Sequence, residues 1–177
     1  MMRIAATLSL LPLLAACAGA GGDAGAKAER AAVPAPSIDL TAEVAALKAL
    51  HQTVLTAHLE GKVEPWMASE ADRIVQANNG VVSFPEKSAR AEGRAAYLGR
   101  TKFTVYRDLR DPIVTVSQDG TLGWLIAEVE TRGVQRADDG TESPVEATWA
   151  WIELYEKQEG VWRGVGNVSN RRPPPSP

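Results

Sequence analysis

The segment TLGWLIAEVETRGV, residues 121–134, indicates a long β-strand with two different faces. Side chains of a strand point alternately to opposite sides of the sheet, so one face carries Leu125, Ala127 and Val129. The other face carries a mixed set: Trp124, Ile126, Glu128 and Glu130. We therefore expect a sheet that covers a core, and the alternation leaves open which of the two faces is the concave one.

More strands are predicted on both sides of this segment. They cover residues 103–109, 113–117, 145–156 and 161–169. Turn residues separate them: Asp119-Gly120, Asp138-Asp139-Gly140 and Glu159-Gly160. Short turns of this kind join neighbouring strands as antiparallel hairpins.

Helices are predicted before these strands. Residues 40–59 have a helical period, with Thr41 as the expected N-cap and Gly61 as the stop signal. Two further helices are expected at residues 64–71 and 86–98, with two short strands between them in residues 72–83. Helices followed by strands indicate the α+β class, and we expect a strongly curved antiparallel sheet with the helices on its concave face.

The order of several short motifs carries a resemblance to a known family. In chain order they are Ala57-His58-Leu59, Asn79-Gly80, Tyr97, Phe103-Thr104-Val105-Tyr106, the segment 111–120, Gly123-Trp124, and Gly160-Val161-Trp162-Arg163. Together they resemble the SnoaL-like branch of the nuclear transport factor 2 superfamily. The resemblance implies a cone-shaped sheet wrapped around the N-terminal helices, a pocket at its wide end, and frequent dimerisation through the sheet.

This resemblance does not decide a function. The superfamily includes ketosteroid isomerases, dehydratases, polyketide cyclases and non-catalytic binding modules, and a fold alone is weak ground for choosing among them. Its enzymes use an acid or base in the pocket and a tyrosine or acid that holds an oxyanion. The last predicted strand contains no Asp, Glu or His in residues 165–170, which counts against an enzyme.

Two histidines are pocket candidates. His51 and His58 lie seven residues apart, on the same apolar helix face as Leu47 and Val54. They are either packed core-edge residues or a polar pair that contacts a ligand. The spacing puts them about 10 Å apart along the helix, too far for one metal ion, so we expect no metal site. By this reading His58 lines the cavity mouth and His51 lies deeper.

Aromatic residues are the other pocket candidates. Trp149 and Trp151 share a strand face with Glu153 and Tyr155, which predicts either a packed core, a dimer face or an aromatic wall around an apolar ligand. The full predicted pocket set is His51, His58, Trp66, Tyr97, Tyr106, Trp124, Glu128, Trp149 and Trp151. If the domain is an enzyme, its base is expected to be His58 or Glu128, and Glu128 qualifies only if its face is concave.

The N-terminus resembles a bacterial lipoprotein precursor. Arg3 precedes an apolar run in residues 4–14, and Leu14-Ala15-Ala16 comes directly before Cys17, the one cysteine of the chain. The run is too short to span a bilayer, which takes about 20 residues. The resemblance implies that residues 1–16 are a signal peptide and that Cys17 is acylated. With Ala18 next, it implies anchoring at the periplasmic face of the outer membrane.

The remaining segments complete the predicted organisation. Residues 17–37 are rich in Ala, Gly and Pro and are expected to tether residues 38–170, which have the length of one domain. Residues 171–177 are expected to be a disordered, proline-rich tail. The net charge of −3 gives no support for nucleic-acid binding.

Three functions remain open from the sequence. The favoured one is a lipid-anchored module that binds a small, mostly apolar molecule without a cofactor. The second is an acid/base enzyme of isomerase, dehydratase or cyclase type that acts on a carbonyl compound. The third is a dimeric assembly module with no catalytic role.

Overall fold

The computed structural model describes residues 38–172, and they begin with helices close to the predicted positions. The helices are α1 (Leu40–Glu60), α2 (Val63–Ala68) and α3 (Lys87–Arg100). The N-cap of α1 is Asp39, which corrects the prediction of Thr41. The Asp39 carboxylate accepts hydrogen bonds from the backbone N–H groups of Thr41 and Ala42, at 3.0 and 3.1 Å. The helix ends at Gly61, whose φ of 68° is the left-handed conformation that glycine adopts easily.

Seven strands form one sheet. They are β1 (Glu70–Asn78), β2 (Val81–Ser83), β3 (Thr101–Asp108), β4 (Ile113–Val116), β5 (Leu122–Arg136), β6 (Glu142–Gln158) and β7 (Val161–Arg171). The order across the sheet is β2-β1-β7-β6-β5-β3, and β4 also pairs with β5. The central strands β5 and β6 pair over their whole length, from Leu122 opposite Glu156 to Arg136 opposite Glu142.

The sheet is antiparallel, as predicted, except at one pair of strands, which makes it mixed. Strand β1 pairs with β7 in the parallel direction, with Gln76 opposite Asn167 and Asn78 opposite Ser169. Tight turns fix the antiparallel direction only for strands that follow each other along the chain. Strands β1 and β7 are separated by nearly the whole domain, so no turn signal in the sequence constrains their relative direction.

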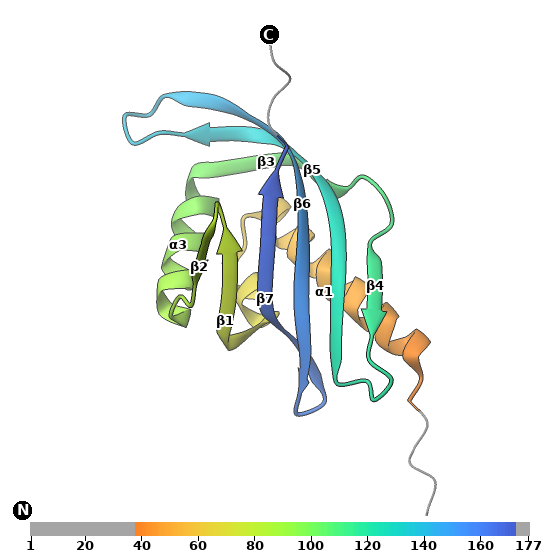
Figure 1. Ribbon diagram of the computed structural model, residues 1–177. Coiled ribbons are helices and arrows are strands. Elements are labelled where there is room, and N and C mark those ends of the chain that lie inside the picture. Colours follow the sequence, from red (N-terminus) through yellow and green to blue (C-terminus); the bar gives the residue numbers. More distant parts are fainter. Residues whose placement is uncertain (1–37, 173–177) are drawn as a thin grey trace, which may run out of the picture. The chain divides into compact units, whose positions relative to one another are not determined.

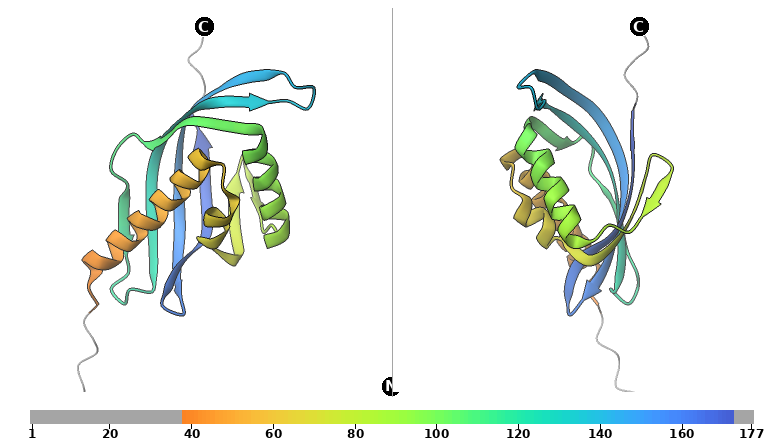
Figure 2. Two further views of the ribbon diagram at one scale, coloured as in Figure 1. Left: turned by 180° about the vertical axis from the view of Figure 1, so that it is seen from behind. Right: turned by 90° about the vertical axis from the view of Figure 1, so that its left-hand side faces the viewer.

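The curved sheet wraps around the helices (Figures 1 and 2), as the sequence predicts. Helix α1 crosses the concave face, and its Leu47 and Leu55 pack in the core with residues of β5, β6 and β7. These partners are Leu125, Ala127, Val129, Tyr155 and Trp162. The Leu125 face of β5 is therefore the concave face, and the Trp124 face is the outer one.

The ordered sheet continues past the predicted end of the domain. Strand β7 runs to Arg171, and the backbone N–H of Arg172 donates to the carbonyl of Thr148 at 2.9 Å. The Arg172 guanidinium also donates to Glu128, at 2.6 Å. Arg171 and Arg172, which the sequence analysis assigned to the tail, therefore belong to the ordered part of the domain.

Some predictions concern residues outside the described range. These are the signal peptide, Cys17, the tether and residues 173–177. Among residues 38–172, no helix is both long enough and apolar enough to cross a bilayer.

Candidate ligand-binding pocket

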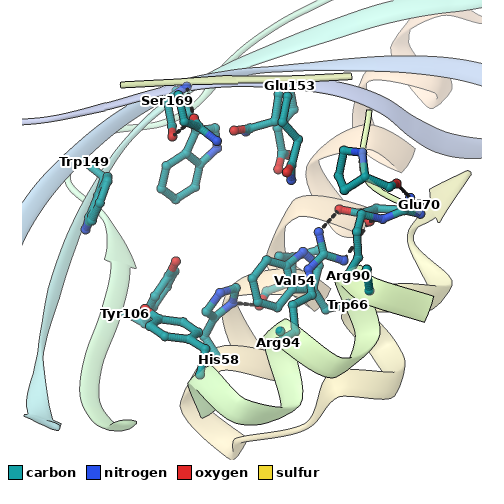
Figure 3. A pocket seen from close by; sticks show the side chains of 18 residues that line it. Val54, His58, Trp66, Glu70, Arg90, Arg94, Tyr106, Trp149, Glu153 and Ser169 are labelled. Carbon is teal, nitrogen blue, oxygen red and sulfur yellow. Dashed lines mark hydrogen bonds and ion pairs between the residues drawn. The ribbon is translucent and has the colours of Figure 1, made fainter. Parts of the chain in front are cut away.

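A cavity of about 530 Å³ lies between the concave face of the sheet and the helices. Residues from α1, α2, α3, β1, β3, β6 and β7 line it. Figure 3 shows Glu153 and Ser169 on the sheet side, and His58, Tyr106, Arg94 and Trp66 across the open space from them. Its volume falls in the range of small-molecule sites in proteins, about 300–1,000 Å³.

Aromatic rings form much of the cavity wall. His58 of α1 stacks on Tyr106 of β3 with ring centroids 4.2 Å apart, and it contacts Trp66 of α2 at the same distance. Tyr97 of α3 and Trp149 of β6 also line the cavity. These rings come from five different elements, so tertiary packing creates the wall and no single segment of sequence does.

His58 is held as a neutral ring. Its Nδ1 lies 2.8 Å from the Val54 carbonyl, which can only accept, so Nδ1 donates the proton and Nε2 keeps a lone pair. Burial lowers the pKa of His58 to about 4, and the positive charge of Arg94 lowers it further, against the hydrogen bond to Val54. At neutral pH the ring therefore offers an acceptor and no charge.

The charged residues at one end of the cavity are paired with each other. Arg94 binds Glu70 with both ends of its guanidinium, at 2.7 and 2.5 Å, and stacks over the Trp66 ring at 4.0 Å. Arg90, one helical turn earlier, lies 3.2 Å from Glu70 and donates to the carbonyls of Ala71, Asp72 and Pro85. Both guanidinium groups are buried, and together they fix α3 against β1.

Glu153 of β6 is an acid that the sequence analysis did not nominate. Its side chain lines the cavity, and its carboxyl accepts a hydrogen bond from the Tyr155 hydroxyl. Burial raises the pKa of Glu153, against the opposite effects of that hydrogen bond and of the nearby His51. The available signal was the alternation itself, which places one carboxylate on the Trp149 and Trp151 face.

Two cavity tyrosines are also held in their neutral form. Burial raises the pKa of Tyr97 to about 12 and raises that of Tyr106 well above its ordinary value. Both hydroxyls are therefore donors at neutral pH.

The structure brings six of the nine predicted pocket residues to the cavity. They are His58, Trp66, Tyr97, Tyr106, Trp149 and Trp151. His51 is fully buried, with Nε2 2.9 Å from Asp108 and its ring edge-on to Trp151 at 6.1 Å between ring centroids. It does not line the cavity, which corrects its place in the predicted pocket set.

Trp124 and Glu128 lie on the outer face of the sheet, which corrects their place in the predicted pocket. Residues of β5 alternate, and Leu125 and Val129 occupy the inner face against α1. Trp124 is 42% exposed, and Glu128 forms ion pairs with Arg110 and Arg172. Glu128 therefore cannot act as a base in this cavity.

No cluster in residues 38–172 is arranged to hold a metal ion. Three or more His, Cys, Asp or Glu side chains do not converge anywhere in this part of the chain.

No protein-family model matches this sequence, and no curated protein matches it either. Solved structures do match the fold. One is a ketosteroid isomerase-like protein from Erwinia carotovora atroseptica, at 19% identity and a TM-score of 0.59, with 75% of this chain and 98% of that chain covered. Another is a putative dehydratase from the NTF2-like family from Streptomyces avermitilis, at 12% identity and a TM-score of 0.59, with 73% and 96% covered.

A third match is an uncharacterised protein with a cystatin-like fold from Caulobacter vibrioides, at 17% identity and a TM-score of 0.58, with 75% of this chain and 92% of that chain covered. At these identities the similarity concerns the fold alone. The domain has the NTF2-like, cystatin-like fold that the sequence motifs predicted.

Proposed function

We propose that the domain binds a small, neutral and mostly apolar ring compound in this cavity. The observation that carries the proposal is an aromatic-walled space of about 530 Å³ in which the charged residues Glu70, Arg90 and Arg94 already pair with each other. The remaining ionisable groups that face the space, His58, Glu153 and the two tyrosines, have pKa values shifted toward their neutral forms. Rings of this kind offer large apolar contact area with a few polar groups for orientation.

Filling the cavity from α3 tests this proposal. A Cβ added at Gly93, which lines the cavity, meets no atom within 4 Å, so leucine can extend into the space without a clash near its Cβ. We expect Gly93→Leu to weaken the binding of 2-naphthol, followed by its own fluorescence, at least about tenfold. Helix stability should not fall, because leucine has a better helix propensity than glycine by roughly 0.5–1 kcal/mol.

The matched control is Gly99→Leu. Gly99 lies on the same helix, has equally open space around its Cβ position and does not line the cavity. Its substitution should leave 2-naphthol affinity unchanged. Equal affinity of the wild-type protein and the Gly93→Leu variant would place the ligand elsewhere.

One observation favours a second candidate, acid/base catalysis on a carbonyl compound. Glu153 lies in the cavity with a raised pKa, the property that lets a carboxyl group exchange protons near neutral pH. Two of the matching structures are described as ketosteroid isomerase-like and as a putative dehydratase. Deuterium exchange of the α-protons of 2-tetralone, compared between the wild-type protein and Glu153→Gln, tests this candidate.

We also propose that the outer face of the sheet is a homodimer interface. Apolar residues are paired there across four strands, Ile113 with Ile126, Ile126 with Ile152, and Ile152 with Val168. All four side chains are at least 36% exposed, and an apolar surface of this extent is typical of an interaction site. Sedimentation velocity of the wild-type protein and of Trp124→Glu, which puts a charge into this face, tests the proposal.

The lipid anchor remains a proposal based on the sequence. Leu14-Ala15-Ala16 before Cys17 supports acylation of Cys17, and Ala18 after it favours attachment to the periplasmic face of the outer membrane. Membrane fractionation of a Cys17→Ser variant, which lacks the thiol to be acylated, tests it.

A further inference from the structure

A row of polar side chains crosses the sheet wall of the cavity. Glu153 of β6 is opposite Asn167 of β7, and Asn167 is in register with Gln76 of β1. All three line the cavity. Side chains paired across neighbouring strands have Cβ atoms about 5 Å apart, so a carboxyl and two carboxamides form a continuous row.

The hydrogen-bonding groups of this row are largely unused. Among the described residues, the side chains of Asn167 and Gln76 form no hydrogen bond with the protein, and Glu153 accepts one, from Tyr155. The next row on the same wall is different, because the Ser169 hydroxyl donates to Asn78 at 2.6 Å. Each free carboxamide offers two N–H donors and a carbonyl acceptor. The row therefore presents donors and acceptors side by side to whatever fills the cavity.

The aromatic groups lie across the cavity from this row. In Figure 3, His58 and Tyr106 face Glu153 across the open space. A flat ring compound that contacts these rings would therefore extend its edge toward the sheet wall. The group at that edge has to satisfy donors and acceptors together, because an unpaired buried polar group costs about 1–3 kcal/mol.

The charged residues around the cavity favour a neutral ligand group at that edge. A ligand carboxylate would place a second acid beside Glu153, in a setting that already disfavours the charged form of that residue. A ligand cation would enter a cavity whose two buried arginines share the single carboxylate of Glu70. An amide is neutral and carries one donor and one acceptor on the same edge.

We propose that the ligand is an aromatic or alicyclic compound with a carboxamide or lactam edge, which pairs with Glu153, Asn167 and Gln76. This inference rests on the proposed binding function of the cavity. A carboxyl or carboxamide side chain complements an amide edge in two hydrogen bonds, one in each direction. Sites built to hydrogen-bond a donor discriminate strongly against analogues that lack it.

Three naphthalene derivatives of similar size test the proposal by isothermal titration calorimetry. They are 2-naphthamide, 2-acetonaphthone, which has the acceptor but no N–H, and 2-naphthoate, which is charged. We expect the wild-type protein to bind the amide at least about tenfold more tightly than either analogue. Asn167→Leu should reduce this preference to less than about threefold, because leucine offers the amide edge neither a donor nor an acceptor.

The control is Asn170→Leu, the same substitution on the outward side of β7, where Asn170 is exposed. It should leave the preference intact, and thermal melting should show that all variants fold. If the wild-type protein binds ketone and amide equally well, the amide edge is wrong and the proposed binding function stands. If it binds none of the three, both are wrong. If Asn167→Leu weakens the binding of all three compounds by the same factor, the row has only a structural role and the inference fails.

Discussion

Trp162→Ala is expected to lower the free energy of unfolding by about 3–5 kcal/mol, the usual loss for a buried tryptophan. Trp162 is 6% exposed and belongs to the core cluster with Leu47 and Leu125. Its indole N–H also donates to Glu43 of α1 at 2.7 Å, so the side chain joins the last strand to the first helix. Most small domains are stable by about 5–15 kcal/mol, so this variant would be close to unfolding. Urea denaturation followed by circular dichroism measures the loss.

Two variants separate the causes of this loss. Trp162→Phe keeps an aromatic ring and removes the N–H. It should lower the free energy of unfolding less than Trp162→Ala does, because the ring still fills the core and Glu43 retains its partner Lys157. Trp124→Ala makes the same change on the outer face, where the side chain is 42% exposed, and should cost about 1 kcal/mol or less. Denaturation at several protein concentrations separates any effect on dimerisation. Equal losses for Trp124→Ala and Trp162→Ala would mean that the assignment of the faces is wrong.

The fold was predictable because strand alternation and helix period are local patterns. Leu125, Ala127 and Val129 recur every second residue, and Leu47 and Val54 recur at helical spacing, whatever the rest of the chain does. The choice of the concave face was not predictable, because the Trp124 face of β5 is also rich in apolar residues. Only the packing of Leu47 of α1 against Leu125 settles which side is the core.

The candidate site was predictable where one element supplies the signal. His58, on the apolar face of α1, lines the cavity as the sequence indicated, whereas His51 on the same face does not. Arg90 and Arg94 gave no such indication, because charged residues four apart on a helix usually face water. They are buried because they pair with Glu70 of β1. A partner on another element cannot be recognised from the sequence around Arg90 and Arg94.

The pH dependence of stability is expected to depend strongly on His58. In the unfolded chain the pKa of histidine is about 6.5, and in the folded protein that of His58 is about 4. Below pH 6.5 the unfolded state therefore binds a proton that the folded state does not, so stability falls as the pH falls. The wild-type protein should lose about 3 kcal/mol through His58 between pH 7 and pH 4, because each pKa unit corresponds to 1.36 kcal/mol.

His58→Phe isolates this contribution, because phenylalanine keeps a ring against Tyr106 and Trp66 and does not titrate. The other groups near the cavity stay the same in both proteins, so their contributions cancel in the difference. Glu153 acts in the opposite direction, since its raised pKa makes the folded state lose stability as the pH rises above the ordinary value for glutamate. Urea denaturation at pH 7 and pH 4 should therefore show a loss about 3 kcal/mol smaller for the variant than for the wild-type protein. Equal losses would mean that folding does not lower the pKa of His58, and the description of a buried ring held in its neutral form would then be wrong.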